Sequence, residues 1–166
     1  MRGATIKSRP ERSDILPILM GNTVTYVMGD LVTVDSDGLL QLITSSDEKI
    51  AGVVVGFVGK NGEPLDFATG YNDRFTSSGT NSTVALHKAL VDVGREIWIQ
   101  IDADASLAQT NLFQYFNTNN SYQVDVGDAS DTDGAVQLVK LDPEGVSDAS
   151  MGLYRIADHQ FGHVDS

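Results

Sequence analysis

Short runs of apolar and β-branched residues, each bounded by turn residues, recur along the chain. The clearest is Glu96–Asp102, in which Ile97, Ile99 and Ile101 alternate with aromatic or polar residues. A period of two places alternate side chains on opposite faces of a strand, so this segment is predicted to be a strand with one face in the core. Trp98 falls on the other face, and we expect it to pack against a second layer rather than form an exposed sugar-binding platform.

An Asp-Gly pair separates two further apolar runs. Leu31–Val34 and Leu39–Ile43 flank the sequence DSDG, and an Asp-Gly turn between apolar runs indicates a β-hairpin. The next run, Ile50–Val58, is continuously apolar, which is typical of a strand buried on both faces. Gly52 and Gly56 interrupt it, and glycine inside a strand indicates a bend or a close approach of another backbone.

The remaining strand candidates complete an all-β pattern. They are Thr23–Val27, Val84–Val93, Ser121–Val126, Ala135–Leu141 and Gly152–Ala157. The sequence therefore predicts a compact antiparallel β-sandwich or barrel, with the choice between the two left open. Gly70–Thr83, which is rich in Gly, Ser, Thr and Asn, is predicted to be a long surface loop.

One segment departs from the strand pattern. Ser106 and Gln109 fit a capping box, in which the two side chains satisfy free N–H groups at the start of a helix. Leu112 and Phe116 follow four residues apart, the spacing of one helix face. We therefore expect one short helix over residues 107–116, ended by the Asn-rich sequence that follows.

A length of 166 residues fits one domain. We expect residues 1–20 to form an extended N-terminal arm, because Pro10 and Pro17 disfavour a helix there, and residues 21–166 to form a single β-rich body. No apolar run reaches the roughly 18–20 residues of a membrane helix, and the N-terminus lacks the apolar stretch of a secretory signal. We therefore expect no membrane partner, and a mature protein identical to the translated one.

Charge is distributed unevenly between arm and body. Residues 1–12 carry Arg2, Lys7, Arg9 and Arg12 against one acidic residue, a net charge of +3, whereas the other 154 residues carry 7 basic and 22 acidic side chains, a net charge of −15. An acidic body repels phosphate backbones, so nucleic acid is not expected as a partner. The four basic residues are predicted to form a docking arm that binds an acidic partner, which could be a second copy of the chain.

Motifs for catalysis are missing from the sequence. The chain has no cysteine, which excludes disulfides, thiolate metal sites and cysteine nucleophiles. The glycines of Gly52–Gly62 match neither nucleotide-binding pattern, and no GxSxG sequence is present. We therefore expect no enzymatic activity and no cofactor, although a small hydrolase that assembles dispersed Asp and His residues is an alternative.

The sequence contains two groups of potential metal ligands. Asp128, Asp131 and Asp133 lie in an acidic sequence whose spacing does not fit a calcium loop, so a solvated turn is expected, with weak calcium binding left open. His159 and His163 are four residues apart, but no helical pattern surrounds them and no third ligand is evident. The sequence therefore predicts no metal site.

Several stretches together suggest a family. GDLVTVDSDGLLQLITSSDEKIAGVVVGFV, followed by REIWIQIDAD, LFQYF, VQLVKLDP and LYRIAD, resembles the capsid cement (decoration) proteins of tailed bacteriophages. The resemblance covers roughly residues 20–160 as an order of elements. It implies a protein that sits outside an icosahedral shell, often as a trimer at local three-fold positions, and clamps neighbouring shell subunits. It implies no catalytic residues.

The sequence thus predicts a non-enzymatic virion protein, made in the cytoplasm of a bacterial host, on the outer surface of the capsid. Its expected partners are the major capsid protein and further copies of itself, with a trimer favoured. The alternatives are another virion β domain, such as a head fibre or a tail-associated domain that binds a host surface, or a small carbohydrate- or protein-binding module.

Overall fold

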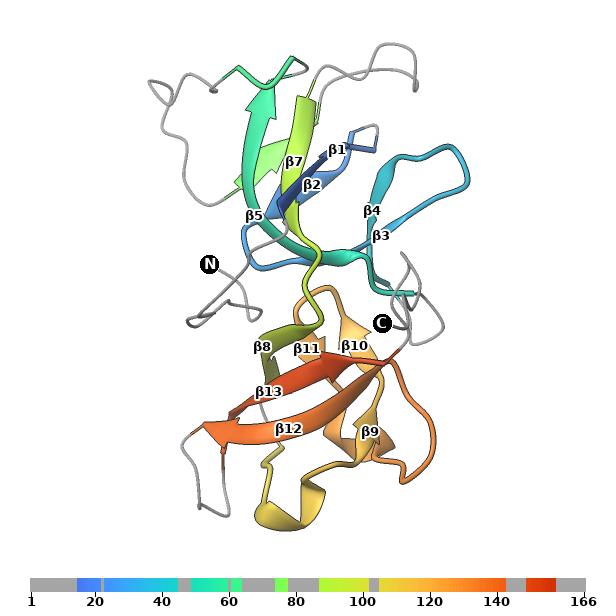
Figure 1. Ribbon diagram of the computed structural model, residues 1–166, viewed down its shortest axis with the longest axis vertical. Coiled ribbons are helices and arrows are strands. Elements are labelled where there is room, and N and C mark those ends of the chain that lie inside the picture. The colour runs from blue at the N-terminus through green and yellow to red at the C-terminus, as the bar shows by residue number, and fades with distance from the viewer. Residues whose placement is uncertain are drawn as a thin grey trace, which may run out of the picture.

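The computed structural model describes residues 15–21, 23–44, 49–59, 61–63, 74–77, 87–101, 105–142 and 149–157. Across these residues the regular structure consists of strands and short 3₁₀ turns, so the prediction of an all-β fold is confirmed. Figure 1 shows two β units along the long axis, an N-terminal one above and a C-terminal one below. The chain passes between them through the short connection 93–95.

The N-terminal unit is a sheet that nearly closes on itself. The unit contains seven strands: β1 (Ile15–Leu19), β2 (Thr25–Val27), β3 (Leu31–Val34), β4 (Leu40–Leu42), β5 (Gly52–Gly59), β6 (Arg74–Thr76) and β7 (His87–Asp92). Five strands follow the order β1-β7-β5-β3-β4, while β2 and β6 pair separately. Met20 forms a parallel bridge with Leu40, which joins the two edges of the five-stranded sheet. We call this unit the N-terminal barrel.

The C-terminal unit closes through the chain itself. It contains β8 (Glu96–Ile101), β9 (Tyr115–Phe116), β10 (Thr118–Asn120), β11 (Gln123–Val124), β12 (Val136–Asp142), β13 (Met151–Ile156) and the 3₁₀ turns η3 (Gln109–Asn111) and η4 (Val126–Asp128). The strand order is β10-β11-β8-β13-β12-β9. Because only Asn117 separates the two edge strands β9 and β10, the sheet curls into a second unit, the C-terminal barrel. Its β8–β11 ladder is parallel, whereas its other ladders are antiparallel.

The hairpin predicted at the Asp-Gly pair is present between β3 and β4. Gly38 has φ +78°, a conformation that glycine adopts without steric cost. The Asp35 carboxylate fixes the turn by accepting hydrogen bonds from the N–H groups of Asp37 and Leu39, both at 2.9 Å. The turn thus follows from local sequence.

Gly52 and Gly56 of β5 have different roles. A Cβ on Gly52 would lie 2.2 Å from the carbonyl oxygen of Asp92, so the backbone of β7 passes where a side chain would be. The β5–β7 register shifts between Val54 and Gly56, which marks a bulge. The prediction of bends and close backbone approach along this strand is confirmed.

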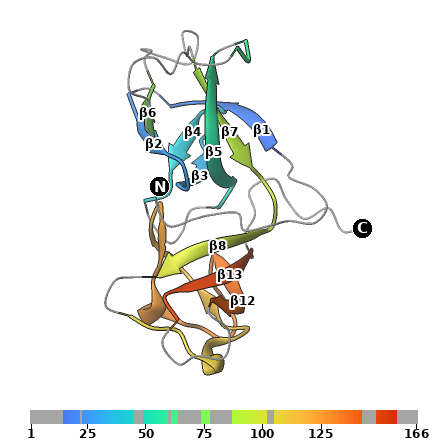
Figure 2. The ribbon, with the colours of Figure 1, turned by 90° about the vertical axis from the view of Figure 1, so that its left-hand side faces the viewer.

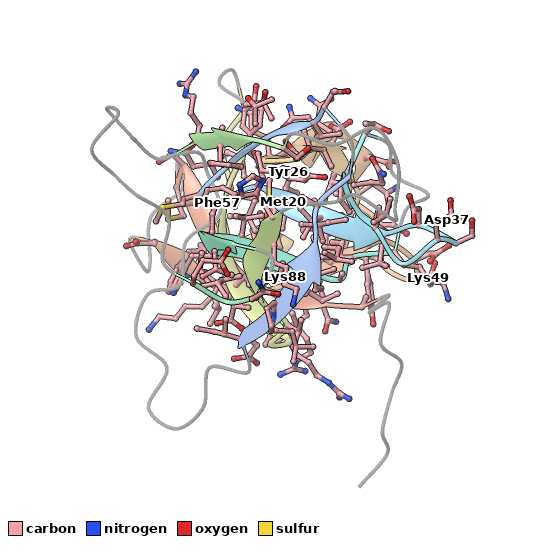
Figure 3. All side chains as sticks on the ribbon, turned by 90° about the horizontal axis from the view of Figure 1, so that it is seen from above. Met20, Tyr26, Asp37, Lys49, Phe57 and Lys88 are labelled. Carbon is pink, nitrogen blue, oxygen red and sulfur yellow. The ribbon has the colours of Figure 1, made fainter. Side chains whose placement is uncertain are left out.

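A shared core joins the two barrels. One cluster, which includes Met20, Tyr26 and Phe57, lies within the N-terminal barrel, and Figure 3 shows these three side chains near one another inside it. The other cluster combines Leu31 and Val53 of the N-terminal barrel with the inward residues of the C-terminal barrel. The two units therefore bury apolar surface against each other.

A buried hydrogen-bonded link crosses the same junction. The Asp30 carboxylate accepts hydrogen bonds from the N–H of Val27 at 2.7 Å and from the hydroxyl of Ser121 at 3.1 Å. The N–H of Leu31 donates to the carbonyl oxygen of Ser121 at 2.5 Å. Asp30 is fully buried, and a buried carboxylate is stable only when it is hydrogen-bonded. The link fixes how the barrels are oriented.

The helix predicted over residues 107–116 is wrong. Its only helical part is the 3₁₀ turn η3, and Tyr115–Phe116 forms strand β9. Leu112 has an extended backbone and Phe113 has φ +68°, and neither conformation continues a helix. The hydrogen bond expected from a Ser106–Gln109 box is replaced by one from the N–H of Ala108 to Asn111 Oδ1.

Two other segments differ from expectation. The predicted loop Gly70–Thr83 contains β6, whose residues pair with β2; the rest of that loop, apart from Ser77, lies outside the described residues. The predicted arm ends earlier than residue 20, because Ile15–Leu19 forms β1 and pairs along its length with β7. The arm hypothesis therefore concerns residues 1–14.

Candidate functional site

The four residues of the predicted docking arm, Arg2, Lys7, Arg9 and Arg12, lie outside the described part of the chain. The described part of the chain begins at Ile15 with β1, which lies beside β7 on one side of the N-terminal barrel (Figure 2). Ile15 and Leu16 are each 43% exposed, and Pro17 is also exposed. An apolar strand that borders solvent therefore follows the basic segment after Ser13 and Asp14.

Near its start, the outer edge of β1 pairs with no strand in the part of the chain that the structure describes. The N–H of Met20 donates to the carbonyl oxygen of His87 in β7, so Ile18 and Leu16 also direct their backbone groups toward β7, because antiparallel pairing alternates along a strand. The backbone nitrogen of Pro17 therefore points away from β7. Its lack of an N–H costs no hydrogen bond between β1 and β7, as is usual for proline in an edge strand. This proline also weakens uncontrolled strand pairing.

Tyr26 anchors the other end of β1. Its hydroxyl accepts a hydrogen bond from the N–H of Gly21 at 3.0 Å and donates to the carbonyl oxygen of Leu40. That carbonyl also accepts from the N–H of Gly21 at 3.0 Å. Burial, together with the nearby charges of Asp35 and Asp30, raises the pKa of Tyr26 to about 12. The phenol therefore stays protonated and holds β1 against β4.

The surface of β1 is apolar rather than charged. Asp92 stands opposite Ile15, but it is fully buried and its Oδ1 accepts the N–H of Gly94 at 2.8 Å. Lys88 stands opposite Leu19, at the far end of the strand. Covering an exposed aliphatic side chain completely contributes about 1.5–3 kcal/mol, so a partner that covers Ile15 and Leu16 gains part of that energy. The geometry suits an apolar docking contact.

The other candidate residues are spread over the C-terminal barrel. Trp98 is half-buried opposite Leu153 and belongs to neither core cluster, so it packs less deeply than the sequence predicts. The Asp131 carboxylate accepts Gln114 Nε2 at 3.0 Å, and Asp128 accepts Asn117 Nδ2. The acidic sequence thus braces neighbouring loops.

The histidines are not brought together by the described structure. His87 begins β7 and packs its ring against Phe75, with the ring centroids 4.7 Å apart, while His159 and His163 lie outside the described residues. Among the residues that the structure describes, no group of three or more His, Cys, Asp or Glu side chains has a geometry suited to a metal ion. Within the same ranges, no helix has the length and apolar character to cross a membrane.

Comparison with known proteins adds no relative: no family model, curated protein or solved structure matches the chain.

Two features of the surface are not predicted by the sequence. The run Ile15–Leu19 is apolar enough to suggest a strand, but its central Pro17 and its position next to the basic segment favoured an arm. Phe113, which is 66% exposed with a positive φ, was placed inside the predicted helix. Nothing in its sequence neighbourhood signals a left-handed backbone, which is rare for a bulky residue.

Proposed function

We propose that this protein is a non-enzymatic component of a bacteriophage virion that binds the outer surface of the capsid and cements neighbouring major capsid protein subunits. The observation that carries the proposal is β1, an exposed apolar strand that is paired with β7 of the N-terminal barrel. It follows residues 1–12, which have a net charge of +3, after Ser13 and Asp14. Such a strand provides an apolar contact, and the basic segment provides an electrostatic one. The resemblance of the strand order to cement proteins supports the same assignment.

Cement acts by mass action. A protein that binds only the assembled shell shifts the equilibrium toward that shell, in proportion to the logarithm of its free concentration over its Kd. Copies that associate with each other bind with an avidity greater than any single contact gives. We therefore propose self-association as well, with a trimer favoured, and the outer surface of the virion as the location of the protein.

Copy number tests the proposal. The protein should be present in purified particles from its source at a simple ratio to the most abundant shell protein, as measured by quantitative mass spectrometry. A handful of copies per particle would instead indicate a tail or vertex component. Absence from particles would overturn the virion proposal and favour a binding module.

A charge-reversal pair tests the arm. Arg9→Glu combined with Arg12→Glu should weaken binding to particles that lack the protein, and should reduce the salt dependence of that binding. Lys49→Glu combined with Lys140→Glu is the matched control, because it makes the same charge change at exposed positions of the body. Equal loss in both pairs would show that only net charge matters and would remove the arm from the mechanism.

A further inference from the structure

Phe113 is the most exposed large apolar side chain in the described part of the molecule, at 66%. Its backbone is left-handed, with φ +68°, which brings Cβ close to the carbonyl oxygen and is unfavourable for residues other than glycine. Residues kept in such conformations are concentrated at ligand clamps and other functional positions. Both the exposure and the backbone therefore need a reason beyond the packing of the barrel.

The surrounding structure holds this backbone from both sides. The N–H of Phe113 donates to the carbonyl oxygen of Leu138 at 2.8 Å, and Gln137 Nε2 donates to the carbonyl oxygen of Phe113 at 3.0 Å. The N–H of Leu138 donates in turn to the carbonyl oxygen of Gln114 at 3.0 Å. Strand β12 thus fixes the backbone of Phe113 and of Gln114.

The preceding turn is braced as well. Asn111 accepts the N–H of Ala108 through Oδ1 at 2.9 Å and donates through Nδ2 to Gln114 Oε1 at 3.0 Å. Leu112, the neighbour of Phe113, packs against the core cluster. The Asn111 amide therefore bonds within the loop, and the Phe113 ring is exposed to solvent together with Gln109 and Thr110.

The position and charge of this loop indicate what it contacts. The segment lies at the end of the C-terminal barrel farthest from the N-terminal barrel, as Figures 1 and 2 both show. Residues 105–139 contain four aspartates and no lysine, arginine or histidine, and the first basic residue beyond them is Lys140. One of the four, Asp131, accepts a hydrogen bond from Gln114, the residue that follows Phe113. Arg155 of β13 stands opposite Gln137, but it forms an ion pair with Glu96 at 3.2 Å. The acidic group that the structure places beside the Phe113 loop is therefore Asp131.

We propose that Phe113 is the anchor of a second docking surface, which inserts into an apolar pocket bordered by lysine or arginine side chains on a shell subunit. The inference rests on the proposed function and sharpens it, because cementing requires each molecule to contact two subunits. β1, which the basic segment precedes in the sequence, and the Phe113 loop, which contacts the Asp131 carboxylate, belong to different barrels. They therefore select two different patches on the shell, and one molecule bridges them.

The variant Phe113→Gly separates folding from binding. Glycine adopts a positive φ without strain, so the Tm should be unchanged or raised. An aromatic anchor at the centre of an interface contributes at least about 2 kcal/mol, so binding should weaken about 30-fold or more. Phe113→Tyr keeps the ring and is the matched control, with binding close to that of the unaltered protein. Binding is measured by cosedimentation with particles that lack the protein.

Each result decides between named alternatives. The inference is supported if Phe113→Gly loses binding while Phe113→Tyr keeps it. If Phe113→Gly binds as tightly as the unaltered protein, the inference is wrong, but the proposed function is not affected. Failure of the unaltered protein to bind particles overturns both. If Phe113→Gly keeps particle binding but changes the oligomeric state in sedimentation velocity, then a second copy occupies the surface and the inference is wrong.

A cross-linking experiment identifies the occupant directly. Because the chain contains no cysteine, Thr110→Cys at an exposed position of the same loop takes a single photo-activatable label. The expected product is a cross-link to the major shell subunit. A cross-link only to another copy of the chain would overturn the inference.

Discussion

The N-terminal barrel closes through one backbone bridge, between Met20 and Leu40, whereas the C-terminal barrel closes because β9 and β10 are consecutive in the chain. In the N-terminal barrel a side chain stabilises the closure: the Tyr26 hydroxyl forms hydrogen bonds with Gly21 next to Met20 and with Leu40. In the C-terminal barrel covalent continuity supplies the closure. We therefore expect point substitutions to open the N-terminal barrel more readily than the C-terminal one.

The largest expected effect comes from glycine substitutions that compare the two barrels. Gly52→Ala places Cβ 2.2 Å from the Asp92 carbonyl oxygen within the central ladder of the N-terminal barrel, and should destabilise the protein by at least about 3 kcal/mol. Gly134→Ala places Cβ 2.8 Å from the N of Phe116 at the short edge strand β9, a smaller overlap than that at Gly52, so about 1–2 kcal/mol is expected. Urea denaturation measures both.

Gly56→Ala is the control on the same strand as Gly52. Its Cβ would lie 3.4 Å from Leu90 Cδ1, an ordinary contact, so a change below about 1 kcal/mol is expected. A loss for Gly56→Ala as large as that for Gly52→Ala would show that β5 needs glycine for a reason other than the β7 backbone.

The next effect concerns the link between the barrels. Asp30→Ala leaves the buried N–H of Val27 and the Ser121 hydroxyl without the carboxylate, and should cost about 2–3 kcal/mol. Because the barrels share a core, the unaltered protein should unfold in one calorimetric transition, and the variant should show a broadened or split one. Ser121→Ala keeps the bond to Val27 and should cost about 1 kcal/mol. Two transitions in the unaltered protein would contradict the shared core.

Tyr26→Phe tests the closure bridge itself. It removes the bonds to Gly21 and Leu40, and should cost about 1–2 kcal/mol at neutral pH. The folded pKa of about 12 exceeds the unfolded value near 10, so this contribution is complete below pH 10 and is lost as pH rises toward 12. The difference in Tm between the two proteins should therefore narrow above pH 10. A constant difference would mean that the phenol ionises alike in both states.

The smallest effect belongs to the β3–β4 turn. Desolvation raises the pKa of Asp35, but hydrogen bonds from Leu39, Gln41 and Asp37 together outweigh it, so the net pKa lies below its ordinary value. The stabilisation is present above the unfolded pKa, near 3.9, and is lost as pH falls through the folded value. Asp35→Asn should cost less than about 1 kcal/mol at pH 7, since solvent screens this group. Its stability should decline less than that of the unaltered protein below pH 4.

Strands specified by their own residues were predictable. Leu31–Val34 forms a strand with the predicted bounds. Ile97, Ile99 and Ile101 are all buried, as their alternation predicts, because alternation along a strand depends only on neighbouring residues. The Asp-Gly hairpin is local in the same sense. The all-β class follows from a sum of such signals.

Features that depend on distant partners were not predictable. Strand β6 exists through pairing with β2, about fifty residues away in the chain, and β1 through pairing with β7. The turn before β9 is set by two hydrogen bonds with β12, from the N–H of Phe113 to the Leu138 carbonyl oxygen and from the N–H of Leu138 to the Gln114 carbonyl oxygen, which override a helical spacing. For the same reason the candidate site was predictable only as a charge asymmetry, and its apolar surfaces emerged from the fold.

The pairing of β1 has a mechanical consequence. Ile15 lies opposite Asp92, the residue at which β7 leaves toward the C-terminal barrel. A pull between the segment before Ile15 and the C-terminal barrel therefore enters and leaves the β1–β7 ladder at the same end, and peels it one residue at a time instead of shearing all its bonds together. Each released residue lengthens the tether by roughly 3.3 Å. Peeling should halt at the bridge that Tyr26 secures, so β1 is expected to yield gradually under tension while the other strands of both barrels stay paired.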